Sequence, residues 1–335
     1  MKKFINDPRN VVDEMLQGLL AAHPELIRSV RDDNRALVRS HAPRDGKVGI
    51  VTGGGSGHLP LFLGYVGEGL LDGVAVGDVF QSPSPEQILD ATRAVDAGSG
   101  VLYVYGNYGG DVMNFDMASE LAMAEGIETR TVIGADDVAS MPADRAAERR
   151  GVAGIFFIYK CAGALAERGA DLDAVTTLAQ RVGERVRTMG VALSPCIIPE
   201  VGRPGFTIGE NEMELGMGIH GEAGIERSAI KTADETTKAI YEQIVADMPI
   251  ASGESVAVLV NGLGATPPEE LYVVFRALKG LLDASGVSVH RSFIGEYATS
   301  MEMAGLSISI MRLDEELASL IDAPFQTPFH VQAGR

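Results

Sequence analysis

Short runs of apolar and β-branched residues alternate, along the first half of this chain, with segments of helical periodicity. The strand-like runs cover 47–52, 74–76, 101–105, 129–133 and 155–159, and each is followed by a turn rich in glycine or aspartate. The helical patterns cover 59–70, 85–95, 115–125 and 162–168. Because strands that alternate with helices form parallel βαβ units, we expect an open α/β sheet with functional side chains at the carboxyl ends of its strands.

The second half of the chain carries a smaller set of similar elements. A helical segment at 172–189 and a strand-like run at 191–196 lead into a passage rich in proline and glycine, 195–224, which we expect to be a loop-built functional surface. The later elements are a helix at 232–248, a strand at 255–261, a helix at 268–284, strands at 287–294 and 307–313, and a helix at 314–321. We therefore predict two α/β domains, 1–185 and 186–335, each with a central sheet flanked by helices, and an active site near the domain junction and the motif loop.

Composition excludes several classes of function. The net charge of −18 opposes nucleic-acid phosphates, which need a basic surface. No apolar run reaches the roughly 20 residues of a membrane span, and the amino-terminal residues lack the apolar core of a secretory signal. Two cysteines, Cys161 and Cys196, are too few for a disulfide scaffold. We expect a cytoplasmic protein that binds neither nucleic acid nor membrane.

The first candidate site is the glycine-rich stretch 53–58, which reads GGGSGH and follows the first strand-like run. Glycines let a backbone approach a ligand closely, and His58 stands at the exit of the turn, where α/β proteins often place chemistry. An ordinary strand-to-helix turn with a capping serine explains the same residues. This stretch alone does not decide between the two.

The second candidate site, GNYGGDVMNF at 106–115, directly follows the strongly β-like run 101–105. Asp111, between a strand and a helix, can accept a hydroxyl proton or cap the helix with its carboxylate. Since two strands of one sheet then each deliver a polar residue at their ends, a shared crevice with the first site is plausible.

The third candidate site, GMGIHGE at 216–222, lies inside the long loop. Glycines on both sides let the His220 imidazole project from a tight backbone, and a neutral ring nitrogen can act as a nucleophile or a metal ligand near neutral pH. The alternative is a loop histidine without function. The other histidines, which we interpret as structural or surface groups, are His23, His41, His290 and His330.

Cofactor motifs are missing from the sequence. There is no G-x-x-x-x-G-K-[ST] phosphate loop, and the stretch at 53–58 matches G-x-G-x-x-G poorly. No cluster of His, Cys, Asp or Glu has metal-ligand spacing, and we interpret Asp136 and Asp137 as solvated surface. We expect no metal and no nucleotide cofactor on this chain.

Three motifs in this order, GGGSGHLP at 53–60, GNYGGDVMNF at 106–115 and GIHGEAG at 218–224, resemble the substrate-binding K subunit of dihydroxyacetone kinases. The similarity covers essentially the whole chain. It extends to FIN at 4–6, GDVFQSPS at 77–84 and VNGLGATP at 260–267.

The resemblance implies a phosphotransferase subunit that acts in glycerol metabolism as a two-domain homodimer. By this resemblance His220 attacks the carbonyl of a short ketose and forms a covalent hemiaminal, which selects carbonyl compounds over polyols. Asp111 acts as general base on the terminal hydroxyl, and His58 hydrogen-bonds the substrate and assists proton transfer. The implied substrate-binding positions are Gly55, Ser56, Gly57, Gly106, Asp111 and His220.

The phosphoryl donor in that family lies on a separate L subunit or domain. The resemblance therefore implies a partner that carries ATP or ADP with Mg²⁺, and this chain leaves open whether ATP is used directly or ADP is rephosphorylated in a phosphotransferase relay. Many dihydroxyacetone-specific members have a lysine where this chain has Gly106. The extra volume could admit a four-carbon ketose such as erythrulose, so either substrate remains open.

Two other functions stay under consideration. A non-catalytic, ketose-sensing relative that acts as a transcriptional co-regulator would use the same fold, but such proteins typically lack the covalent histidine, whereas His220 is present. A Rossmann-type dehydrogenase fits the βαβ pattern but not the missing dinucleotide fingerprint.

Overall fold

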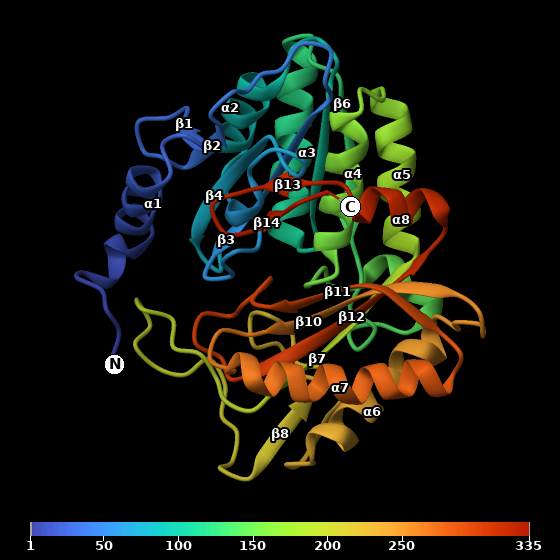
Figure 1. Ribbon diagram of the computed structural model, residues 1–335. Coiled ribbons are helices and arrows are strands. Elements are labelled where there is room, and N and C mark those ends of the chain that lie inside the picture. The colour runs from blue at the N-terminus through green and yellow to red at the C-terminus, as the bar shows by residue number, and fades with distance from the viewer. Residues whose placement is uncertain (1, 335) are drawn as a thin grey trace. The chain divides into compact units, whose positions relative to one another are not determined.

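The computed structural model describes residues 2–334, which divide into two compact units (Figure 1). The first unit comprises the residues up to 134 together with 158–182 and 320 onward, and the second comprises 135–157 and 183–319. Each unit holds a six-stranded sheet flanked by helices, which confirms the predicted fold class. Independent folding of 1–185 and 186–335 as two domains stays a prediction.

The sheet of the first unit carries the first two candidate sites. Its strands, in spatial order, are β1 (Ile27–Ser29), β2 (Ala36–Arg39), β4 (Gly73–Val79), β3 (Gly49–Ser56), β5 (Val101–Gly106) and β6 (Thr129–Gly134). The last four of these run parallel, whereas β1 and β2 extend the sheet in antiparallel pairing. The predicted parallel sheet is therefore confirmed for the strands that end at the candidate sites.

Helices cover both faces of this sheet. On one face Val51 shares a hydrophobic core with residues of α2 (Pro85–Val95) and α3 (Gly109–Ala124). The next residue, Thr52, forms a 2.9 Å hydrogen bond between its hydroxyl and the Tyr159 hydroxyl of α4 (Ile155–Glu167). Since successive side chains of a strand point to opposite faces, α4 covers the face opposite α2 and α3. The remaining elements of this unit are α1 (Val11–Ala22), most of α5 (Leu172–Glu184), β13 (Phe325–Gln326) and β14 (Val331–Gln332).

The second unit has a mixed sheet. Its strands, in spatial order, are β11 (Ser288–Gly295), β10 (Ser255–Gly262), β12 (Gly305–Leu313), β7 (Val186–Ala192), β8 (Glu212–Leu215) and β9 (Glu226–Ala229). Only the β10 and β11 pair is parallel. The helices α6 (Ala233–Asp247) and α7 (Pro268–Ala284) pack on the apolar side chains of β7, β10 and β12. The short helix α8 (Glu315–Ile321) follows β12.

Two elements differ from the sequence prediction in kind. Residues 155–159, predicted as a strand, form the start of helix α4, because a fully buried apolar run carries no periodicity that separates helix from strand. Residues 59–70, predicted as a helix, contain only a 3₁₀ turn at Leu63–Tyr65. Pro60 and the glycines at 64, 67 and 69 interrupt the helical backbone there.

Two element boundaries also differ from the sequence prediction. The helix predicted over 172–189 ends at Glu184, and Val186–Ala192 becomes the strand β7. The passage 195–224, predicted as loop, contains the strand β8 at Glu212–Leu215. In both places, pairing with a neighbouring strand outweighs the local sequence pattern.

Candidate active site

The glycines at 53–55 lie inside strand β3 rather than in a turn. This strand pairs with β5 only as far as Val51, whereas its pairing with β4 continues to Ser56 through a register shift after Gly55. The predicted turn begins only at Gly57, whose φ of +100° lies in the region that favours glycine. The glycine-rich end of β3 thus leaves the neighbouring strand at the carboxyl edge of the sheet.

Close packing within the protein accounts for the glycines of β3. A Cβ atom at Gly54 would overlap the Phe62 ring, and one at Gly55 would lie 2.6 Å from the backbone nitrogen of Gln81. The Ser56 hydroxyl donates to the Gly77 carbonyl oxygen at 2.8 Å. These residues therefore build the edge of the site, and only their backbone groups are left as candidates for contact with a ligand.

His58 is fully buried next to this strand end. Its ring stacks on Phe80 with 4.7 Å between centroids and meets the Phe62 ring edge-on at 6.3 Å. The Phe80 N–H donates to the Ser56 carbonyl oxygen at 3.0 Å, which ties the 77–84 motif to the 53–58 stretch. The aromatic contacts fix the plane of the imidazole ring.

Asp111 lies in the first turn of helix α3, which begins at Gly109, earlier than the predicted start at 115. The side chain is 5% exposed. A carboxylate in the first turn of a helix interacts favourably with the helix dipole, whereas burial opposes its charge. Tyr105 lies in the preceding strand, β5. Burial raises the pKa of its hydroxyl, and the charges of Asp116 and Asp111 raise it further.

The 77–84 segment also contacts the start of helix α3. The Asn114 side chain donates to the Pro83 carbonyl oxygen at 2.8 Å, and a Cβ atom at Gly110 would lie 2.6 Å from the Ser82 hydroxyl. Three sequence motifs therefore meet where β3, β4 and β5 end. The structure places His58 and Asp111 at this edge, together with Gly55, Ser56, Gly57 and Gly106.

His220 lies in the second unit, in a tight turn after β8. Its ring Nδ1 is 3.1 Å from the Glu222 carboxylate Oε1, and its backbone N–H donates to Oε2 of the same carboxylate at 2.9 Å. The His220 side chain is 24% exposed. Glu222 lies within the motif quoted above but was not predicted as a site residue; a carboxylate two residues after a candidate histidine is the signal that identifies it.

Electrostatics keep Glu222 ionised. Burial raises the pKa of its carboxyl, but the hydrogen bond from His220, the charge of that ring when it is protonated, and the charge of Arg150 lower it more strongly, to about 2. An ionised carboxylate can only accept hydrogen bonds. The bond to Nδ1 therefore requires the proton on that nitrogen, which leaves Nε2 of a neutral imidazole with its lone pair available.

The prediction that Asp136 and Asp137 form solvated surface is wrong. They are 3% and 2% exposed. Asp136 accepts the backbone N–H groups of Val152 and Gly154 at 2.9 and 2.8 Å, and Asp137 pairs with Arg150. Burial raises the pKa of both carboxyls, that of Asp137 to about 6 against the opposing charge of Arg150.

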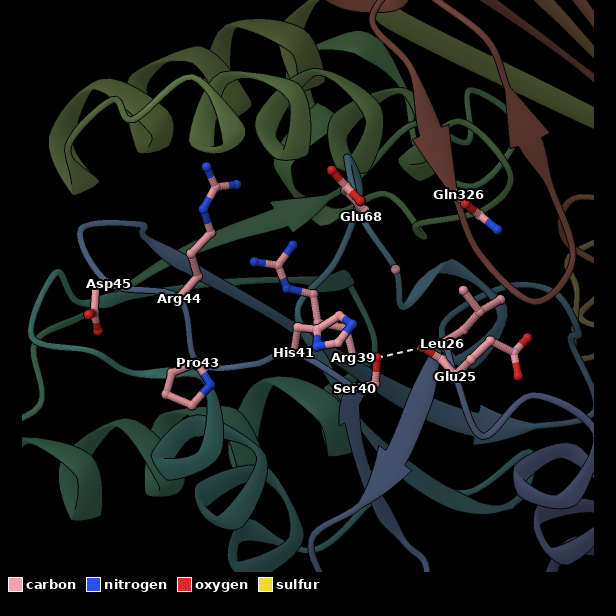
Figure 2. A pocket seen from close by; sticks show the side chains of 11 residues that line it. Glu25, Leu26, Arg39, Ser40, His41, Pro43, Arg44, Asp45, Glu68 and Gln326 are labelled. Carbon is pink, nitrogen blue, oxygen red and sulfur yellow. Dashed lines mark hydrogen bonds between the residues drawn. The ribbon is translucent and has the colours of Figure 1, made fainter.

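A cavity of about 610 Å³ in the first unit lies apart from the predicted residues (Figure 2). Arg39 and Arg44 line it, and each forms an ion pair with Glu167. Figure 2 also shows the Ser40 hydroxyl donating to the Glu25 carbonyl oxygen. The lining of this cavity also includes the carboxylates of Glu25, Asp45 and Glu68, so acidic side chains offset the positive charge of the two arginines. We assign no ligand to it.

Residues 2–334 contain neither a metal-binding cluster nor a membrane-spanning helix. Within that range, no group of three or more His, Cys, Asp or Glu side chains has the geometry to hold a metal ion. Within the same range, no helix combines the length and the apolar character that crossing a bilayer requires.

Comparisons with known proteins identify the family. The family model described as the Dak1 domain matches residues 17–329. The chain is 45% identical over 329 residues to the dihydroxyacetone-binding subunit DhaK of PTS-dependent dihydroxyacetone kinase 2 from Listeria innocua, and the match covers 98% of this chain and 99% of the relative.

A second relative is a longer enzyme. The chain is 42% identical to a D-erythrulose kinase from Mycolicibacterium smegmatis; the match covers 98% of this chain but 56% of that protein. Among solved structures, the dihydroxyacetone kinase operon co-activator DhaQ superposes with a TM-score of 0.89 at 31% identity, covering 96% of this chain and 98% of the other.

Proposed function

This chain belongs to the Dak1 family and is a subunit of a phosphotransferase of the dihydroxyacetone kinase type; from this premise we propose that it holds a short ketose covalently on His220 while the terminal hydroxyl of that ketose receives a phosphoryl group. The observation that carries the proposal is the bond between His220 Nδ1 and Glu222. It orients a partly exposed imidazole with Nε2 as a nucleophile.

The addition step balances without any cofactor. Nε2 attacks the carbonyl carbon, the π electrons of the C=O bond move to oxygen, and this oxygen takes up a proton to give the hemiaminal hydroxyl. The Nδ1 proton, already directed at Glu222, is released to solvent, and the ring returns to neutrality. Glu222 stabilises the imidazolium that forms between these events, because an adjacent carboxylate favours the charged ring. Glycerol and other polyols have no carbonyl and cannot form this bond.

Phosphoryl transfer then requires a base at the terminal hydroxyl. We assign this role to Asp111, because its place in the first turn of α3 favours the ionised carboxylate that accepts a proton. His58, fixed by its ring contacts, hydrogen-bonds the substrate and assists proton transfer. Backbone groups of Gly55, Ser56, Gly57 and Gly106 supply further contacts.

The phosphoryl donor is proposed to lie on a separate L subunit that carries ATP or ADP with Mg²⁺. Such a partner would position the phosphoryl group and its Mg²⁺ would neutralise phosphate charge, the two effects that supply most of the acceleration in phosphoryl transfer. We further propose a cytoplasmic homodimer that acts in glycerol metabolism. Gly106, together with the similarity to an erythrulose kinase, supports a four-carbon ketose as an alternative to dihydroxyacetone.

A second candidate function is ketose sensing. The similarity to the DhaQ co-activator supports it, whereas the presence of His220 favours the kinase. A coupled kinase assay with candidate L partners, comparing dihydroxyacetone, glyceraldehyde and both erythruloses, separates the two. We expect turnover that requires both proteins and a ketose. Ketose binding without turnover with any partner would support sensing instead.

A further inference from the structure

We propose that Arg150 is the positioning residue of the His220 loop: anchored on the buried Asp137 carboxylate, it holds Glu222 and the backbone at Gly216, and so keeps the imidazole in the tautomer that can attack a carbonyl. This inference rests on the proposed covalent role of His220. All the residues concerned belong to the second unit.

The anchor is a buried ion pair of good geometry. Arg150 Nε and Nη2 lie 2.9 and 2.7 Å from the same Asp137 oxygen, Oδ2. The other oxygen, Oδ1, accepts the Ala139 backbone N–H at 3.0 Å. The two side chains are 15% and 3% exposed. Both carboxylate oxygens are thus engaged, and the guanidinium has one orientation.

From this anchor the guanidinium reaches the loop at two points. Arg150 Nη2 donates to the Gly216 carbonyl oxygen at 3.1 Å, and Nη1 lies 3.9 Å from Glu222 Oε2. That oxygen is the one that accepts the His220 backbone N–H, while Oε1 meets the ring. Arg150 is therefore within ion-pair distance of the carboxylate oxygen that also accepts the His220 backbone N–H.

Gly218 provides independent evidence that these side chains are packed as a unit. A Cβ atom at this position would lie 2.6 Å from Arg150 Nη1 and would overlap the Glu222 carboxylate. The missing side chain thus makes the space in which the two charged groups meet. This explains a glycine two residues before His220 without any direct contact to a substrate.

The neighbouring arginine shows that this arrangement is specific. Arg149 points instead to Asp247 of α6, with nitrogen–oxygen distances of 2.8 and 2.5 Å, and to the Met141 carbonyl oxygen. Consecutive arginines therefore serve different purposes, one holding the body of the unit and the other holding the His220 loop. A lysine at 150 keeps the charge but cannot make the forked contacts of a guanidinium.

The test reads the tautomer of His220 directly. Long-range ¹H–¹⁵N NMR spectra of the full chain with ¹⁵N-labelled histidine, at a pH of about 8 where an ordinary imidazole is neutral, are compared for the wild type, Arg150→Met and Arg150→Lys. The His220 signal is assigned by its loss in His220→Gln. Arg145→Met is the matched control, because Arg145 pairs with Glu148 at the surface. Binding of dihydroxyacetone and glycerol is measured on the same samples.

We expect Nδ1 to carry the proton in the wild type and the control. We expect a mixture of tautomers in Arg150→Met, and a smaller fraction of the Nε2-protonated tautomer in Arg150→Lys. The lysine variant also provides the test if Arg150→Met does not fold. Dihydroxyacetone affinity should fall about tenfold or more, because the other tautomer has no lone pair on Nε2 for the covalent bond, with glycerol affinity unchanged. A wild-type tautomer in both Arg150 variants overturns the positioning role. A ¹³C NMR spectrum of labelled dihydroxyacetone bound to the wild type tests the covalent function separately. If the tautomer depends on Arg150 but the carbonyl carbon keeps its chemical shift on binding, the positioning role stands and the covalent function is refuted.

Discussion

The two regions that carry the candidate residues, one in each unit, use glycine for different purposes. At the end of β3 the glycines admit other parts of the protein, the Phe62 ring and the backbone at Gln81, and His58 is fully buried against aromatic rings. Near His220, the absence of a side chain at Gly218 leaves room for the charged groups of Arg150 and Glu222, and the histidine is partly exposed with a carboxylate at Nδ1. The first region is fixed by packing and the second by ion pairs.

This difference implies a division of labour. A packed, buried edge suits proton transfer at fixed distances, because its groups do not rearrange. A partly exposed histidine suits reversible bond formation with a ligand that must enter and leave. We therefore expect variants of the first region to change kcat most, and variants of the second to change KM most.

The largest effect is expected at Asp111. Asp111→Asn keeps the size of the side chain but removes the base, so kcat should fall by roughly 10²- to 10⁴-fold with ketose binding retained. Steady-state kinetics with the L partner and ketose titration by calorimetry provide the measurement. Normal turnover would show that Asp111 is not the base and would break the division between the regions.

The next effect is expected at His220. His220→Ala removes the covalent bond, and we expect KM for the ketose to rise about tenfold or more, with part of kcat surviving. Glycerol should bind this variant and the wild type equally. A loss confined to kcat would place His220 in the chemical step rather than in retention of the substrate.

Packing at β3 predicts a stability effect. Gly54→Ala introduces a Cβ atom into the Phe62 ring, so we expect a loss of about 1–3 kcal/mol in the free energy of unfolding. Gly109→Ala, where nothing lies within 4 Å of the added atom, is the matched control and should change it by less than about 0.5 kcal/mol. Denaturant unfolding of both variants provides the comparison, and equal stability would contradict the packing role of the β3 glycines.

The smallest effect concerns the pH dependence of stability in the ion-paired region. Burial raises the pKa of Asp137 from 3.8 to about 6, so the folded state binds this proton more tightly than the unfolded state. The stabilisation from this proton is present below the unfolded pKa and is lost as pH rises towards and through 6. Thermal melts at pH values between 3.8 and about 6 should show that the melting temperature declines less steeply with rising pH for Asp137→Asn than for the wild type. Identical slopes would show that Asp137 does not titrate there.

Local signals predicted some elements well. Helix α2 has the predicted bounds because Ser84 and Gln87 form a capping box, with Pro85 at the first helical position, and these signals lie within a few residues of each other. Helix α7 likewise begins at Pro268 as predicted. The parallel strands followed from the alternation of strands and helices.

Distant contacts explain the failures. Two adjacent aspartates resemble solvated surface in the sequence, because nothing near them shows that Arg150 will pair with Asp137, or that the backbone N–H groups of Val152 and Gly154 will donate to Asp136, in the interior. The sequence also pointed to His220 but not to the carboxylate that selects its tautomer, although Glu222 is only two residues away. The roles of Asp111, His58 and His220 stay predictions.

The crystal structure of the chain soaked with dihydroxyacetone at saturating concentration tests the central claim most directly. The account predicts continuous electron density between His220 Nε2 and a tetrahedral ketose carbon, with Nδ1 still facing Glu222. A bound ketose with a planar carbonyl, separated from His220 by van der Waals distance, would contradict it.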